Sequence, residues 1–149
     1  MKKDIVIFLD FDGVLHYFFP RKDISDEDNA YFAFLPLFEN TIRELQKECN
    51  FKIVISSSWR ESRTLQELKS MFSNDIAELI VGKNGYVAEI NKFSRELESI
   101  EWLKDNDNND KWIAIDDNPD IWRSHEKLVL CEERFDDESA DKLKKMCLA

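Results

Sequence analysis

A short hydrophobic run, residues 5–9, constrains the fold of this chain more than any other segment. It holds β-branched and aromatic residues, is too short for a helix and is soon followed by Gly13, which is typical of a buried strand in a parallel sheet. Asp10 and Asp12 come directly after it. In open α/β sheets, ligands bind beyond the carboxyl ends of such strands, so we expect both carboxylates at a ligand site. An Asp-Gly pair also occurs in ordinary turns and caps, so the motif alone leaves two interpretations open.

Two later hydrophobic segments end in polar clusters in the same way. Residues 51–55 run into three serines at 56–58, and residues 112–115 run into an acid pair at 116–117. Because the carboxyl ends of parallel strands lie at one edge of a sheet, we expect these side chains to meet those that follow the first strand. Each cluster also has a plain interpretation as a helix cap or a turn. We therefore favour one shared pocket over three unrelated caps or turns at the same edge.

The rest of the chain alternates between strand and helix patterns. Further strands are expected at residues 79–81 and 128–130, and helices at residues 36–45, 61–72, 94–104 and 137–146. In the third helix, Ser94 is the expected N-cap. Leu97, Ile100 and Leu103 are expected to point inward. The alternation predicts an α/β fold, Rossmann-like and three-layered, with a central parallel sheet and helices on both faces.

The size and composition predict one domain over residues 1–149. Glycine and proline number only three each, so no flexible linker is expected. The irregular segment 17–35 follows the first strand and is too short to fold as a separate cap, which predicts a capless or minimally capped protein. The aromatic side chains at 17–19 are expected either to stack on a base or to pack on the core.

Charge and cysteine content exclude several classes of protein. The net charge is −10, from 21 basic and 31 acidic side chains, which argues against a general nucleic-acid binder. No stretch reaches the roughly 18 apolar residues of a membrane span, so no membrane partner is expected. Cys49, Cys131 and Cys147 are widely spaced and form no CxxC pair, so we expect reduced thiols and a cytoplasmic location. Nothing indicates an obligate protein partner.

The order of the motifs resembles the haloacid dehalogenase (HAD) superfamily in its phosphatase form. That order is Asp-x-Asp-Gly, a serine after a strand, a basic residue before a helix, and Asp-Asp after a strand. The sequence at residues 9–15, 56–60, 95–96 and 115–117 resembles the HAD domain of Swiss Army Knife RNA repair proteins. Residues 114–123 are also similar to the 3′-phosphatase domain of phage polynucleotide kinase. Val14 stands where the wider superfamily often has threonine, as it does in the Swiss Army Knife subgroup.

The resemblance implies a Mg²⁺-dependent phosphoric monoester hydrolase. Asp10 would be the nucleophile that forms an aspartyl-phosphate, and Asp12 the general acid and base. Mg²⁺ would be held by Asp10, Asp116 and the main-chain carbonyl of Asp12, with Asp117 as a direct or water-mediated ligand. An open, capless site would suit a large phosphorylated substrate, such as the 3′ or 5′ end of a nucleic acid.

The resemblance also implies groups that bind the phosphate. Ser56 would donate a hydrogen bond to a phosphoryl oxygen, and Ser57 is the alternative, because three serines in a row hide which hydroxyl points inward. Arg60 would reach the phosphate or the substrate, or else pack against Trp59 at the start of a helix.

A cation should offset the charge of the transferring phosphoryl group. Arg95 matches the subgroup, and Lys92 is its competitor because many superfamily members use lysine; either could instead be a solvated charge at a helix start. Two other functions stay open. One is a phosphoacceptor module like a response-regulator receiver, although receivers place the acid pair first and the phosphorylated aspartate later. The other is a catalytically idle binding module.

Overall fold

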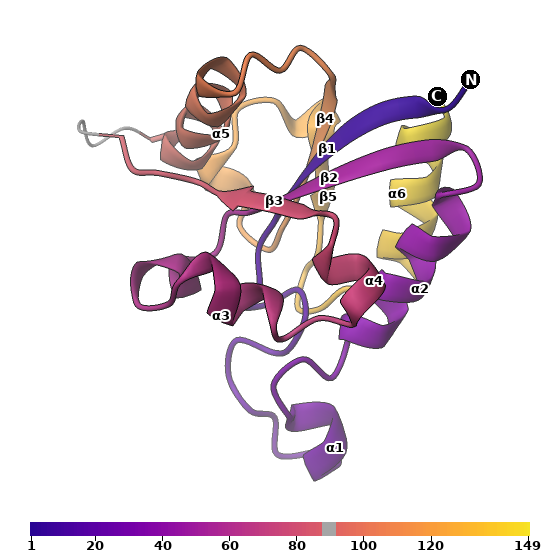
Figure 1. Cartoon of the computed structure of the whole chain (residues 1–149). Helices are drawn as coiled ribbons and strands as arrows, with labels where there is room; N and C mark the ends of the chain where they lie inside the picture. Colours follow the sequence, from indigo (N-terminus) through magenta and orange to yellow (C-terminus); the bar gives the residue numbers. More distant parts are fainter. Residues whose placement is uncertain (88–91) are drawn as a thin grey trace.

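The computed structural model describes residues 1–87 and 92–149, and within them the chain is built around a five-stranded sheet. The strands are β1 (Lys3–Leu9), β2 (Cys49–Ile55), β3 (Ile80–Lys83), β4 (Lys111–Asp116) and β5 (Leu128–Leu130). Their order is β3-β2-β1-β4-β5, and all neighbouring strands pair in parallel (Figure 1). The predicted strands and the parallel sheet are confirmed. The strand order reverses between β1 and β4, which is where open α/β sheets bind ligands.

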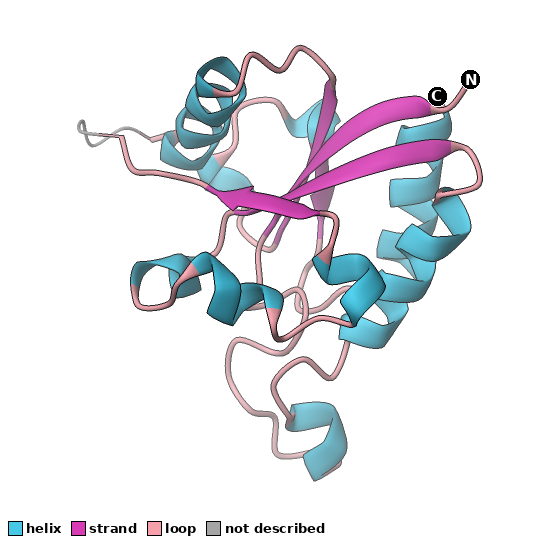
Figure 2. Cartoon of the chain, in the orientation of Figure 1, coloured by secondary structure: helices cyan, strands magenta, loops and turns pink. Residues whose placement is uncertain are grey.

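Helices cover both faces of this sheet (Figure 2). They are α1 (Asp26–Asn29), α2 (Leu35–Leu45), α3 (Leu65–Lys69), α4 (Asn74–Ala77), α5 (Ser94–Asp105) and α6 (Asp137–Leu148), with short 3-10 helices η1 (Ser58–Glu61), η2 (Pro119–Ile121) and η3 (His125–Lys127). Helices α2 and α6 pack against each other, and α5 lies on the opposite side of the sheet (Figure 1). Within the described chain, the segment from β1 to α2 holds a single short helix, α1.

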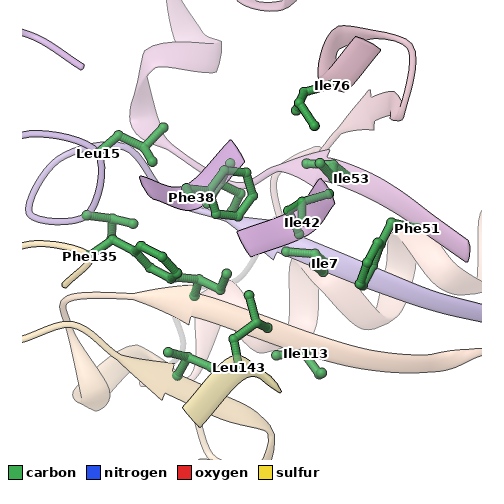
Figure 3. Close-up of a cluster of buried hydrophobic side chains, with 14 of the residues drawn as sticks. Ile7, Leu15, Phe38, Ile42, Phe51, Ile53, Ile76, Ile113, Phe135 and Leu143 are labelled. Atoms are coloured by element: carbon green, nitrogen blue, oxygen red, sulfur yellow. The ribbon is translucent and has the colours of Figure 1, made fainter. Parts of the chain in front are cut away.

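Two hydrophobic clusters fill the spaces between the three layers. Alternate residues of β1 point to opposite faces, so Ile7 belongs to one cluster and Phe8 to the other. The larger cluster contains Phe38 of α2 and Leu143 of α6 (Figure 3). The smaller one contains Trp122, which is fully buried beside β4. This double burial explains why β1 reads as a continuous hydrophobic run.

The prediction of one helix over residues 61–72 is wrong. The chain forms η1, then begins α3 after a new cap at Thr64. The Thr64 hydroxyl accepts a hydrogen bond from Glu67 N, and the Glu67 carboxylate accepts one from Thr64 N, each at 3.1 Å. This capping box satisfies amide groups that a continuous helix would have paired along its axis. The short helix α4 that follows was not predicted.

Helix α5 differs from the prediction in its cap and its inward face. Phe93 is the N-cap and Ser94 is the first helical residue. Leu103 is buried as predicted, but Leu97 is exposed. Polar side chains take the inward positions instead, namely those of Glu96, Glu98 and Ser99. Glu96 accepts a hydrogen bond from Ser124 N, Glu98 pairs with Arg60 and the Ser99 hydroxyl accepts one from Asn84, so this face is held by polar contacts.

Other sequence expectations concern the cysteines and the membrane. All three thiols are free and buried. No helix within the described residues combines the length and the apolar character that crossing a bilayer requires.

Candidate active site at the carboxyl edge of the sheet

Main-chain hydrogen bonds join the strand ends that carry the predicted site. Asp10 N donates to the carbonyl of Ile115 at 3.0 Å, and Ser56 N donates to the carbonyl of Leu9 at 2.9 Å. The ends of β1, β2 and β4 are therefore locked side by side. The predicted convergence of the three polar clusters is found at this edge.

Three carboxylates gather at the centre of this edge. Asp10, Asp116 and Asp117 each offer one oxygen, and the three oxygens lie within 4.8 Å of one another. Asp116 is 1% exposed, and its two oxygens accept hydrogen bonds from Asn118 N at 3.0 Å and from Trp122 Nε1 at 3.1 Å. These bonds fix the side chain without cancelling its charge. Three hard oxygen donors at one point are the ligand chemistry that Mg²⁺ prefers, so the residues fit that ion.

The electrostatics of the cluster point the same way. Burial, together with the charges of Asp116 and Asp117, raises the pKa of Asp10 well above its usual range, and Arg95 opposes this shift. Burial and the contact with Asp116 raise the pKa of Asp117 to about 6. The cluster is thus strained by repulsion when ionised, and a bound cation would relieve that strain.

Gly13 allows the loop after β1 to approach the acid pair. Its φ is +76°, in the left-handed region that favours glycine. A Cβ at this position would lie 2.2 Å from Oδ2 of Asp117. The glycine of the motif is therefore required both by its backbone conformation and by the space that Asp117 occupies.

The three serines have different environments. Ser57 is the N-cap of η1, where its hydroxyl accepts a hydrogen bond from Trp59 N at 3.2 Å. Ser56 is fully buried, and its hydroxyl has no hydrogen-bond partner among the described residues. A buried hydroxyl without a partner is costly, by about 1–3 kcal/mol. The geometry therefore favours Ser56 over Ser57 as a donor to a bound ligand.

The two candidate cations also differ. The Arg95 guanidinium donates to the carbonyl of Ser56 and lies near enough to Asp10 to oppose the rise in the pKa of that carboxyl. Lys92 is exposed, and its ammonium lies 5.7 Å from the ring centroid of Phe93. The structure brings Arg95 to the site and places Lys92 at the surface.

Arg60 is buried and bonded to the protein along its whole guanidinium. It donates to the carbonyls of Ser56 at 3.0 Å and Ser57 at 2.9 Å, and it forms an ion pair with Glu98. Of the cations near Trp59, Arg63 lies over its ring, whereas the Arg60 guanidinium lies over the ring of Tyr86. Through these hydrogen bonds, Arg60 holds the main chain of the loop after β2.

Asp12 lies beside the cluster, and its side chain is held by two residues that the sequence did not single out. Oδ1 of Asp12 is 2.7 Å from His16 Nε2 and 3.1 Å from Trp59 Nε1. His16 follows Asp12 by four residues, and Trp59 follows the serines directly. Their proximity to the two motifs was the available signal, but neither spacing indicates a shared partner.

The parallel sheet, the Asp-x-Asp-Gly loop after β1 and the acid pair after β4 define a HAD-type fold. Residues 6–138 match the model of the family described as the HAD domain in Swiss Army Knife RNA repair proteins, and the chain belongs to that family. Searches of curated proteins and of solved structures found no match.

Proposed function

We propose that this protein is a Mg²⁺-dependent phosphomonoesterase that works through an aspartyl-phosphate on Asp10. One observation carries the proposal. The buried Asp10 carboxylate lies in an acidic cluster that fits a divalent ion, next to the unpartnered hydroxyl of Ser56 and the guanidinium of Arg95. A phosphate group would satisfy all three features at once.

The family and the acidic cluster support the following binding roles. The carboxylates of Asp10 and Asp116 and the carbonyl of Asp12 would hold Mg²⁺, with Asp117 as a further ligand, direct or through water. When bound, the ion neutralises the cluster and polarises the phosphoryl oxygens. Ser56 donates a hydrogen bond to one of these oxygens, and Arg95 offsets their charge.

The reaction has two halves. In the first, the Asp10 carboxylate attacks phosphorus, the bond from phosphorus to the leaving oxygen breaks, and Asp12 gives a proton to that oxygen. In the second, Asp12 takes a proton from water while the water oxygen attacks phosphorus. The bond from Asp10 to phosphorus breaks, which releases inorganic phosphate and restores the free carboxylate.

We propose the end of a nucleic acid as the substrate. The family of RNA repair domains supports this, and so does a groove of about 420 Å³ that shares Gly13 and Asp117 with the site. Phe18 and Phe19 line the groove, and they are 58% and 74% exposed with ring centroids 4.7 Å apart. Exposed rings of this kind stack on bases with little sequence preference.

Acidic side chains in the lining of the groove limit how much nucleic acid is contacted. Glu132 and Glu133 line it as well, and Glu133 pairs with Arg21. Carboxylates repel backbone phosphates, so the groove suits the terminal nucleotide alone. This arrangement reconciles a nucleic-acid end with the net charge of −10.

The first experiment is hydrolysis of an aryl phosphate with and without Mg²⁺. Asp10→Asn should lower kcat by more than about 10³-fold, since the nucleophile is lost, and Asp12→Asn should lower it strongly as well. Asp105→Asn is the control, because Asp105 is an exposed acid on α5. Undiminished turnover by Asp10→Asn would contradict the covalent mechanism, and an inactive wild type would support an idle binding module.

The second experiment identifies the substrate with 3′- and 5′-phosphorylated oligonucleotides, nucleotides and phosphopeptides. We expect release of phosphate from at least one kind of nucleic-acid end. Hydrolysis restricted to phosphopeptides would refute the nucleic-acid assignment and leave the phosphatase standing.

A further inference from the structure

We propose that His16 and Trp59 are positioning residues that orient Asp12 for proton transfer, an inference that rests on the proposed phosphatase function. Both side chains hydrogen-bond to the same oxygen, Oδ1 of Asp12, at 2.7 Å and 3.1 Å. They come from different elements, since His16 lies in the loop after β1 and Trp59 in η1. Two donors from separate elements define both the position and the plane of the carboxyl group.

The main chain fixes which ring nitrogen of His16 carries the proton. Phe32 N donates to His16 Nδ1 at 3.3 Å, so Nδ1 is an acceptor. The N–H of the neutral ring is then on Nε2 and points at Asp12. His16 is 1% exposed, so water does not compete for either nitrogen.

Aromatic packing holds both donors in place. The ring of His16 lies 4.9 Å from that of Tyr31, 5.2 Å from that of Phe32 and 5.4 Å from that of Trp59. Trp59 also packs edge-on against Phe11, at 5.6 Å. The main chain closes the loop below them, where Gly13 N donates to the carbonyl of His16 at 2.9 Å. Neither donor can leave Asp12 without disturbing this cluster.

The consequence concerns the other oxygen of Asp12. Oδ1 already accepts two hydrogen bonds, whereas Oδ2 accepts none from the parts of the chain that the structure describes. A proton exchanged with the substrate therefore travels through Oδ2. It passes to the leaving oxygen in the first half of the reaction and is taken from water in the second. Small displacements of a catalytic group cost about 10²-fold in rate. The two hydrogen bonds to Oδ1 therefore raise the rate by holding Oδ2 in position for proton transfer.

The test compares two substrates that differ in their need for a proton. The phenolate of an aryl phosphate with an acidic phenol leaves without a proton. The alkoxide of an alkyl phosphate is a poor leaving group and needs a general acid to protonate it. We expect His16→Phe and Trp59→Phe to lower kcat/KM for the alkyl phosphate by about 10- to 100-fold and for the aryl phosphate by less than about threefold. His16→Gln keeps an N–H donor, so its kcat/KM for the alkyl phosphate should fall less than that of His16→Phe.

Two controls separate positioning from packing. Tyr31→Ala removes ring contacts to both donors but leaves their N–H groups, so it should change the ratio of the two kcat/KM values less than His16→Phe or Trp59→Phe does. In an Asp12→Ala background, adding Trp59→Phe should cause no further loss, because the residue acts through Asp12.

The outcomes are distinct. Equal losses on both substrates, or a further loss in the Asp12→Ala background, would overturn this inference while leaving the phosphatase intact. A wild-type protein that hydrolyses neither substrate would overturn the proposed function and the inference together. Thermal melting of each variant identifies any that fail to fold, and Trp59→Phe, at a half-buried position, keeps the test open if His16→Phe does not fold.

Discussion

Arg60 and Glu98 form a buried ion pair, with 3.3 Å between Nη2 and Oε2, that ties η1 to α5. The side chains are 3% and 7% exposed. Because Arg60 also holds the carbonyls of Ser56 and Ser57, the pair sets the path of the chain that presents the Ser56 hydroxyl. The ion pair is thus part of the frame of the site.

Removing Arg60 should destabilise the protein strongly. Arg60→Met removes the nearer of the two cations at the buried Glu98 carboxylate and leaves only Arg95, at 4.0 Å, which costs up to about 3–5 kcal/mol in the free energy of unfolding. Urea denaturation measures the change. The matched control is Arg43→Met, which breaks an exposed ion pair of Arg43 with Asp75 (2.8 Å) and should have a much smaller effect. Similar losses in both variants would show that the burial of the Arg60 pair is unimportant.

The glycine of the motif should be irreplaceable. Gly13→Ala places a Cβ against Asp117 and forces a left-handed backbone on alanine, so we expect at least a ~100-fold fall in phosphatase activity and weaker Mg²⁺ binding. Gly85→Ala is the control, since a Cβ there meets no atom within 4 Å. Activity and calorimetric Mg²⁺ titrations test both variants. A fully active Gly13→Ala would contradict the described contact with Asp117.

Stability should depend on pH through Asp117. Its raised pKa means that the folded protein binds this proton more tightly than the unfolded chain does. The contribution to stability is therefore complete below about pH 4 and is lost as the pH rises past about 6. Asp117→Asn removes this loss, so without metal it should be more stable than wild type at pH 8 by on the order of 1 kcal/mol, and the gain should vanish at pH 4.

Mg²⁺ should reverse that order. At pH 8 the ion binds the native cluster and stabilises the wild type more than Asp117→Asn, which has lost a ligand. Thermal melts at both pH values, with Mg²⁺ or EDTA, measure the difference. If Mg²⁺ raised both melting temperatures equally, Asp117 would have no part in holding the ion.

The groove at Phe18 and Phe19 should act on nucleic-acid substrates alone. Stacking on a base contributes about 1–3 kcal/mol, so the double alanine variant should lower kcat/KM for a 3′-phosphorylated oligonucleotide by roughly 5- to 100-fold. An alkyl phosphate without a ring should be hydrolysed as before. Leu148→Ala is the control, because Leu148 is an exposed hydrophobic residue near the N-terminus and away from the site. Equal rates on oligonucleotides for wild type and the double variant would exclude the groove from binding.

Much of the fold could be predicted because its signals are local. The hydrophobic runs that became β1, β2 and β4 each carry their own period and length, and parallel pairing then places their polar ends together. The helix predicted over 61–72 failed because the cap at Thr64 competes with helical continuation. Leu97 was wrongly predicted to be buried because α5 turns polar residues inward. Hydrophobic periodicity cannot predict polar side chains that are buried by their hydrogen bonds.

The site was predictable to a similar depth. The acids were predicted from their strands, whereas the contact of Arg95 with the Ser56 carbonyl depends on the position of α5 relative to β2. The link from His16 to Trp59 through Asp12 needed the packing of η1 on the loop after β1. Contacts between segments far apart in the chain produce no sequence pattern from which they could be predicted.

The two ends of the described chain meet at the edge of the sheet opposite the acidic cluster. Lys3 Nζ donates to the carbonyl of Ala149 at 2.9 Å, and Figure 1 shows the termini side by side. A tether attached at either end would therefore leave the catalytic edge facing away from the support. A short linker could also join the ends, so that new termini opened in a surface loop give a circular permutant with its sheet and its acids in place.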